Sequence, residues 1–217
     1  MRGNFNELTS WPQWVRDLSR ELQNSGVYTT GIESDNKQRG TSINVDLYGY
    51  KEEENLAIIQ VRECVFHPRR FNQVRKNYYL IGRGDTGQVF AHPIESPIRS
   101  KKALETPEST VDFALSKIWD CPIDDLPFII RQGDIAFIPV PSLPKNAIES
   151  SNSIILRETH KITGKIWKTP DGKLYCQKAR MIHTKGQHSP VKVKDYYYRI
   201  QQGTRARLWN FSLAKGD

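Results

Sequence analysis

The sequence lacks the features that mark membrane and secreted proteins. No apolar run approaches the roughly 18 residues that are needed to cross a bilayer. The first residues, MRGNFNELTSW, contain no apolar stretch of the kind found in a secretory signal. Cysteine is scarce: Cys64, Cys121 and Cys176 are odd in number and far apart, which predicts reduced thiols rather than a disulfide framework. We therefore expect a cytoplasmic protein without membrane contact.

Acidic residues are scarce in one part of the chain. Residues 152–217 hold 14 Lys and Arg against 4 Asp and Glu, a net charge of +10, whereas residues 1–151 hold 18 against 20, a net charge of −2. Surfaces that only confer solubility mix both signs, so this asymmetry indicates an anionic partner for the C-terminal third. RNA or single-stranded DNA is the partner that we expect, and other subunits of a nucleoprotein complex are further candidates.

Aromatic residues, by contrast, are abundant for so polar a chain. Five Trp, nine Tyr and eight Phe are too many for a disordered protein, which would lack the apolar area to offset the entropy cost of ordering. Alternating apolar residues predict strands over 42–50 and 56–66, and a β-hairpin over 77–92. A first helix is predicted from a stripe with helical spacing, made of Trp11, Trp14, Val15, Leu18 and Leu22.

The second half of the chain is predicted to be mostly strands. A second helix begins at Thr106-Pro107 and ends near Asp120. From residue 129 onward, short apolar segments alternate with turns such as Pro170-Asp171-Gly172, a spacing that favours a small barrel or sandwich. We therefore predict an α+β fold with two regions: a helix with an antiparallel sheet over 1–128, and a β-rich basic region over 129–217.

The densest cluster of cations and aromatics lies in residues 180–209. If residues 191–202 form one strand, alternation places Lys192, Lys194, Tyr196 and Tyr198 on one face. Cations neutralise phosphates and aromatic rings stack on bases, so this face suits a single-stranded nucleic acid. The predicted phosphate contacts are Arg180, Lys185, Lys192, Lys194, Arg199, Arg205 and Arg207, with Tyr196 and Tyr198 as stacking residues and with Arg69, Arg70, Arg75 and Lys76 as an extension of the track.

Two histidines at the edge of this cluster suggest chemistry as an alternative. His183 and His188 flank a Lys-Gly-Gln turn, so their rings can face one another. Together with Cys176 they match no standard zinc spacing, and we predict neither a metal nor a cofactor. They could act as general acid and base on a phosphodiester, which makes a metal-independent ribonuclease the second hypothesis. The two histidines could also be ordinary turn residues. A subunit that binds an acidic protein is the third hypothesis for the whole chain.

The N-terminal half contains an arrangement that resembles a degraded PD-(D/E)xK nuclease core. Asp46 lies on one predicted strand and Gln60-Val61-Arg62 on the next. That family holds a divalent metal with an acidic pair and a lysine. Here Gln60 replaces the second acid and Arg62 replaces the lysine, and an arginine does not serve as a base. The resemblance therefore implies a coincidence or an inactive relic.

Residues 129–202 resemble a small family of uncharacterised bacterial and phage proteins. The matching segments are RQGDIAFIPVPSLP (131–144), His160, IHTKGQHSPVKV (182–193) and YRIQQ (198–202). The resemblance implies no activity, but it suggests a bacterial or phage setting. Together with the basic region, it leads us to expect a nucleic-acid-binding accessory protein of a bacterial or phage nucleoprotein system.

Overall fold

The computed structural model describes residues 3–4, 11–25, 31–36, 39–66, 73–84, 87–96, 105–186 and 188–203. The chain divides into two compact units: the first contains the described residues up to Ala114 and the second is Leu115–Thr204. Each contains one antiparallel sheet, so the predicted α+β class is confirmed. The predicted division into 1–128 and 129–217 stays a prediction.

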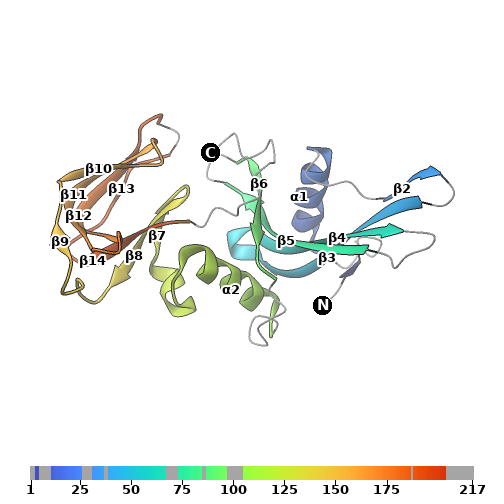
Figure 1. Cartoon of the computed structure of the whole chain (residues 1–217), viewed down its shortest axis with the longest axis horizontal. Coiled ribbons are helices and arrows are strands. Elements are labelled where there is room, and N and C mark those ends of the chain that lie inside the picture. The colour runs from blue at the N-terminus through green and yellow to red at the C-terminus, as the bar shows by residue number, and fades with distance from the viewer. Residues whose placement is uncertain are drawn as a thin grey trace. The chain divides into compact units, whose positions relative to one another are not determined.

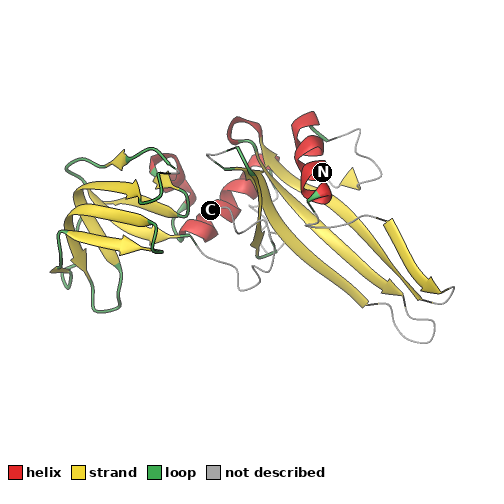
Figure 2. Cartoon of the chain, turned by 90° about the horizontal axis from the view of Figure 1, so that it is seen from above, coloured by secondary structure: helices red, strands yellow, loops and turns green. Residues whose placement is uncertain are grey.

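The first unit is an antiparallel sheet with a helix on one face (Figures 1 and 2). The strand order is β1-β3-β4-β5-β6, with β2 paired to β3. The helix α1 packs against β5 and β6. The bounds are β1 Gly3–Asn4, α1 Gln13–Asn24, β2 Gly31–Asn36, β3 Arg39–Lys51, η2 Glu52–Glu54, β4 Leu56–Phe66, β5 Gln73–Arg83 and β6 Val89–Ile94.

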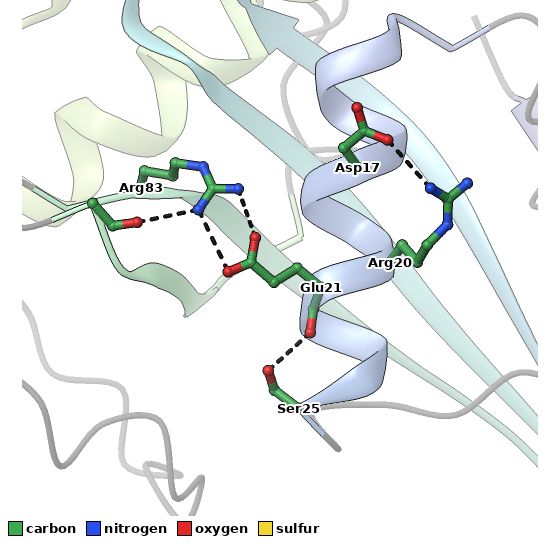
Figure 3. Close-up of polar contacts among 6 residues, drawn as sticks. Asp17, Arg20, Glu21, Ser25 and Arg83 are labelled. Carbon is green, nitrogen blue, oxygen red and sulfur yellow. Dashed lines mark hydrogen bonds and ion pairs between the residues drawn. The ribbon is translucent and has the colours of Figure 1, made fainter.

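The apolar stripe of α1 is buried as predicted. Val15 and Leu22 are fully buried against the sheet, and Trp14 packs at the edge of the same core. Near the C-terminal end of α1, the Arg83 guanidinium on β5 donates to the Glu21 carboxylate at 2.6 Å and to the Gly87 carbonyl oxygen at 3.1 Å (Figure 3). Burial of the stripe stabilises the unit far more than this exposed ion pair, which is worth at most about 1 kcal/mol.

The second predicted helix is also confirmed, as α2 Pro107–Trp119. Its first turn is capped because the Ser109 backbone N–H donates to Thr106 Oγ1 at 3.1 Å. The helix start lies close to β3: a side chain at Gly49 would collide with the Pro107 carbonyl oxygen. Among the described helices, none is long and apolar enough to cross a membrane.

The second unit is an open eight-stranded antiparallel sheet. Its strand order is β10-β11-β12-β14-β8-β7, with β13 also paired to β12 and β9 to β11. In the described part of the chain it does not close into the barrel that was one of our expectations. The bounds are η5 Ile123–Phe128, β7 Ile130–Gln132, β8 Ile135–Val140, β9 Ile148–Glu149, β10 Ser153–Leu156, β11 His160–Lys168, β12 Leu174–His183, β13 Val191–Lys192 and β14 Tyr197–Gln202.

The prediction of one strand over 191–202 is wrong. β13 pairs with β12 at Arg180 and Met181, whereas β14 pairs with the other end of β12 and with β8. The chain changes register between them because β12 contains a bulge, where Lys178 adopts a φ of 50°. Residues 193–196 follow this bulge rather than extending a strand, so alternation cannot be counted through them.

The bulge depends on a glycine in the neighbouring strand. Gly164 on β11 has a φ of 143°, and a Cβ atom there would lie 2.7 Å from the Ala179 Cα atom. Only glycine tolerates both the conformation and the close approach. The main core cluster lies on one face of the sheet and consists of Ile135, Phe137, Ile162, Ile166, Cys176, Ala179, Met181, Val193, Tyr198 and Ile200. On β8 the other face is buried as well, at Ala136 and Ile138.

Candidate nucleic-acid interface

The face of the second sheet opposite its core carries a group of exposed cations. On β11, Ile162 and Ile166 point into the core, so Lys161 and Lys165 point to the other face. On β12, Arg180 lies between the buried residues Ala179 and Met181 and is exposed. The next strand places Lys192 directly opposite Arg180. We call Lys161, Lys165, Arg180 and Lys192 the basic face.

The cations of the basic face lack acidic partners among the described residues. Within the described residues, none of its four cations forms an ion pair with a carboxylate. Thr163, opposite Arg180 on the β11 side, is neutral. Like charges directly opposite each other on neighbouring strands are destabilising. The arrangement of Arg180 and Lys192 therefore costs stability in the isolated protein, and an anion bound across the pair would remove that cost.

Two further lysines border the basic face. Lys178 lies in the β12 bulge and pairs with the Asp195 carboxylate at 2.9 Å, both side chains being largely exposed. Lys194 is exposed beside it, since its carbonyl oxygen accepts from the Lys178 backbone N–H at 3.0 Å. An exposed pair such as Lys178 and Asp195 is weak and exchanges readily with another anion. Lys194 is thus available to extend the basic face, and Lys178 is available only in competition with Asp195.

The structure separates the two predicted stacking tyrosines. Tyr196 is 72% exposed, whereas Tyr198 is 8% exposed and packs edge-to-face on Phe137 in the core, with ring centroids 6.3 Å apart. The expectation that Tyr198 presents its ring to a base is therefore corrected. The sequence assigned Tyr198 to the exposed face because it does not show the break between β13 and β14. This break shifts the alternation of β14 relative to β13.

Arg199 is engaged within the fold rather than free for phosphate. Its guanidinium donates to an Asp120 carboxylate oxygen at 2.8 Å and to the backbone carbonyl oxygen of Asp120. The Arg199 side chain is only 14% exposed. These bonds tie β14 to the end of α2, where the last carbonyls lack helical partners. A phosphate contact by Arg199 would have to break them, so the structure assigns this residue a role in stability.

The remaining predicted cations lie elsewhere. Lys185 is exposed in the turn after β12. Arg75 and Lys76 are exposed on β5 of the first unit, where they lie opposite Glu63 and Arg62. Four more predicted contacts, Arg69, Arg70, Arg205 and Arg207, lie outside the described residues.

The histidines form a cluster of three, one more than the sequence indicated. His160 and His183 lie directly opposite each other on β11 and β12, with ring centroids 4.9 Å apart. His188 joins them at 5.2 Å from His183 and 6.4 Å from His160. A Cβ atom at Gly133 would lie 3.4 Å from the Nε2 atoms of both His160 and His188, so glycine leaves room for the rings. His160 was missed because strand pairing, not sequence spacing, places it there.

The histidine cluster lies inside the unit. His160 is 3% exposed and His183 is 5% exposed, so a phosphodiester outside the protein has no direct access to the His183 ring. Burial lowers the pKa of His160, against the nearby Asp134 carboxylate, which raises it. Burial also lowers the pKa of His183, and the neighbouring His188 and Lys185 act in the same direction. The lowered pKa keeps the His160 and His183 imidazoles largely neutral at neutral pH.

The polar contacts of the cluster are internal. His160 Nδ1 lies 3.0 Å from Thr159 Oγ1 and 3.9 Å from the Asp134 carboxylate. His183 Nδ1 accepts from the Lys185 backbone N–H at 3.3 Å. Among the residues that the structure describes, no three histidine, cysteine or acidic side chains are arranged to hold a metal ion. These contacts orient the rings within the fold.

The Asp46, Gln60 and Arg62 side chains come together on the first sheet. Asp46 and Gln60 lie directly opposite each other, and Arg62 follows on the same face. The Gln60 side chain is buried and its Nε2 donates to the hydroxyls of Tyr48 and Tyr78, at 3.1 and 2.5 Å. The amide is thus held by two neutral hydroxyls, which indicates a structural role for Gln60.

Comparison of the chain with protein-family models, with curated proteins and with solved structures finds no match. The resemblance of residues 129–202 to bacterial and phage proteins therefore stays a prediction, as does the resemblance of the first sheet to a nuclease core.

Proposed function

We propose that the second unit binds single-stranded nucleic acid, RNA or DNA, through the basic face, as an accessory protein of a bacterial or phage nucleoprotein system. The observation that carries the proposal is the position of Arg180 directly opposite Lys192, with Lys161 and Lys165 on the same face. Within the described residues, no carboxylate pairs with any of the four. A surface built at a cost to stability is best explained by a polyanion that it binds.

The size of the basic face fits a few phosphates. Residues four apart on a strand are about 13 Å apart, and two strand spacings add about 10 Å across the sheet. Lys161 to Lys165 spans the first distance, and β11 to β13 spans the second. An area of this size supports contacts to a short stretch of backbone, which suits a single strand lying across the sheet rather than a long duplex track.

The first test is binding of a labelled single strand, oligo(U) or oligo(dT), followed by fluorescence anisotropy at about 50 mM salt, where phosphate contacts are strong. We expect binding by the native chain and a clear loss for the double variant Arg180→Gln with Lys192→Gln. A charge-matched control removes two exposed lysines of the same unit outside the basic face, Lys145→Gln with Lys173→Gln. It should bind like the native chain.

Other outcomes of this test point elsewhere. Equal losses in both double variants would mean that net charge, not the basic face, governs binding, and the site would be wrong. No binding of either polymer by the native chain would refute the proposal and favour an acidic protein as the partner. The 260/280 absorbance ratio of the purified protein gives an early indication, because co-purified nucleic acid raises it.

A metal-independent ribonuclease is a second candidate. It rests on the 5.2 Å separation of the His183 and His188 rings and on the partial exposure of His188, and it requires the cluster to open, because the His183 ring is buried. General acid and base catalysis needs two such groups near the scissile bond. Cleavage of labelled RNA in EDTA that is lost in both His183→Ala and His188→Ala would support this candidate, and intact RNA would reject it.

A further inference from the structure

We infer that Trp167 and Tyr197 form a base-stacking platform beside the basic face, so that the ligand is a single strand with accessible bases rather than any polyanion. The inference rests on the proposed function and goes beyond it, because it names two aromatic residues outside the predicted site. Tyr196 and Tyr198 were the residues that sequence alternation favoured, and Tyr198 lies in the core.

The two rings lie on the same side of the sheet as the basic face. On β11, the core residue Ile166 separates Lys165 from Trp167, so both point away from the core. On β14, Tyr198 points into the core opposite Cys176, so its neighbour Tyr197 points to the outer face. Residues two apart on a strand are about 6.7 Å apart. Trp167 therefore continues the row of Lys161 and Lys165 along β11.

The two rings contact each other and are partly exposed. Their centroids are 5.8 Å apart and their planes make an angle of 77°, an edge-to-face pair. Such a pair holds each ring in place before any ligand binds. Tyr175 lies directly opposite Trp167 on β12 and is buried. A fixed and partly exposed ring loses little entropy when a base stacks on it, which favours binding.

The charges around the rings separate phosphates from bases. Lys165 lies on one side of Trp167, toward Arg180 and Lys192, whereas Glu149 on β9 lies directly opposite Trp167. A carboxylate there repels phosphate but not a neutral base. The sugar-phosphate backbone of the bound nucleic acid is thus expected over the basic face, with its bases turned toward Trp167 and Tyr197. In a duplex the base faces are stacked on one another, so only a single strand can use the platform.

The test compares Trp167→Leu and Tyr197→Leu with the native chain on three polymers: oligo(U), oligo(dT) and heparin, a sulfated polyanion without bases. Stacking contributes roughly 1–3 kcal/mol per base, so each variant should weaken binding of both single strands by about 5- to 150-fold. Heparin affinity should not change, because the basic face is intact. Trp167→Phe, which keeps a ring, should recover most of the loss.

The outcomes are separable. Native-like affinity of both leucine variants for the single strands would overturn the platform, as would equal affinity of the native chain for a single strand and a duplex of the same length. If Trp167→Leu does not fold, judged by its circular dichroism spectrum and unfolding midpoint, Tyr197→Leu decides. A native chain that binds neither single strand refutes the proposed function itself, whether or not it binds heparin. Single-strand binding that is unchanged in both leucine variants refutes only the platform.

Discussion

Replacing Arg180 with glutamine should separate the function of the basic face from the stability of the fold. Arg180 is exposed on β12 and lies directly opposite Lys192, and no carboxylate pairs with either residue in the described part of the chain. Opposed like charges on neighbouring strands cost about 0.2–1 kcal/mol. Arg180→Gln removes that repulsion, so the free energy of unfolding should stay the same or rise by up to about 1 kcal/mol.

The same change should weaken binding of a single strand. Each phosphate contact contributes about −0.7 to the slope of log affinity against log salt for a single strand. The loss of one contact therefore makes that slope less negative by about 0.7. Binding is measured by anisotropy over a salt series, and stability by urea unfolding of the same preparation.

A control with the opposite expectation is available on β14. Arg199 is mostly buried and donates to the side chain and backbone of Asp120. Arg199→Gln should lower the free energy of unfolding by about 1–3 kcal/mol, because it removes charge-assisted hydrogen bonds, and should leave the salt slope of the folded protein unchanged. A destabilised Arg180→Gln variant, or one whose salt slope equals that of the native chain, would refute the role of Arg180 in the basic face.

Two further predictions concern the stability of the second unit. Because burial lowers the pKa of His160 and His183 from their ordinary 6.5, the unfolded chain binds protons that the folded chain does not, so stability should be full above about pH 6.5 and fall as the pH decreases below it. Urea midpoints measured at descending pH check this. If the midpoint of a His160→Gln variant falls with pH as steeply as that of the native chain, the prediction is contradicted. Gly164→Ala should cost about 1–3 kcal/mol, since the new Cβ would lie 2.7 Å from the Ala179 Cα atom. Gly172→Ala, in an open turn at a φ of 87°, should cost less because a Cβ atom there meets nothing within 4 Å. A thermal unfolding midpoint that falls more for Gly172→Ala than for Gly164→Ala would contradict this.

The parts of the fold that depend on local pattern could be predicted from the sequence. The stripe from Trp11 to Leu22 requires a helix because its spacing buries one side only. The turn at Asp171 and Gly172 and the helix start at Thr106 follow from residue types that favour those conformations. The structure confirms these elements.

The parts that depend on long-range pairing could not. One extra residue in the β12 bulge at Lys178 reverses which side chains face outward beyond it, and nothing in the local sequence marks its position. Alternation counted through residues 193–196 therefore assigned Tyr198 to the surface and overlooked Tyr197. His160 and His183 are far apart in sequence, and strand pairing alone places them together.

Ultraviolet cross-linking of the native chain to a photoreactive single strand, followed by mass spectrometry of the linked peptides, tests the central claim most directly. The account predicts cross-links in β11 and β14, at Trp167 and Tyr197, and their loss when Arg180 and Lys192 are both replaced by glutamine. Cross-links confined to peptides of the first unit, or cross-links that the double variant leaves unchanged, would contradict it.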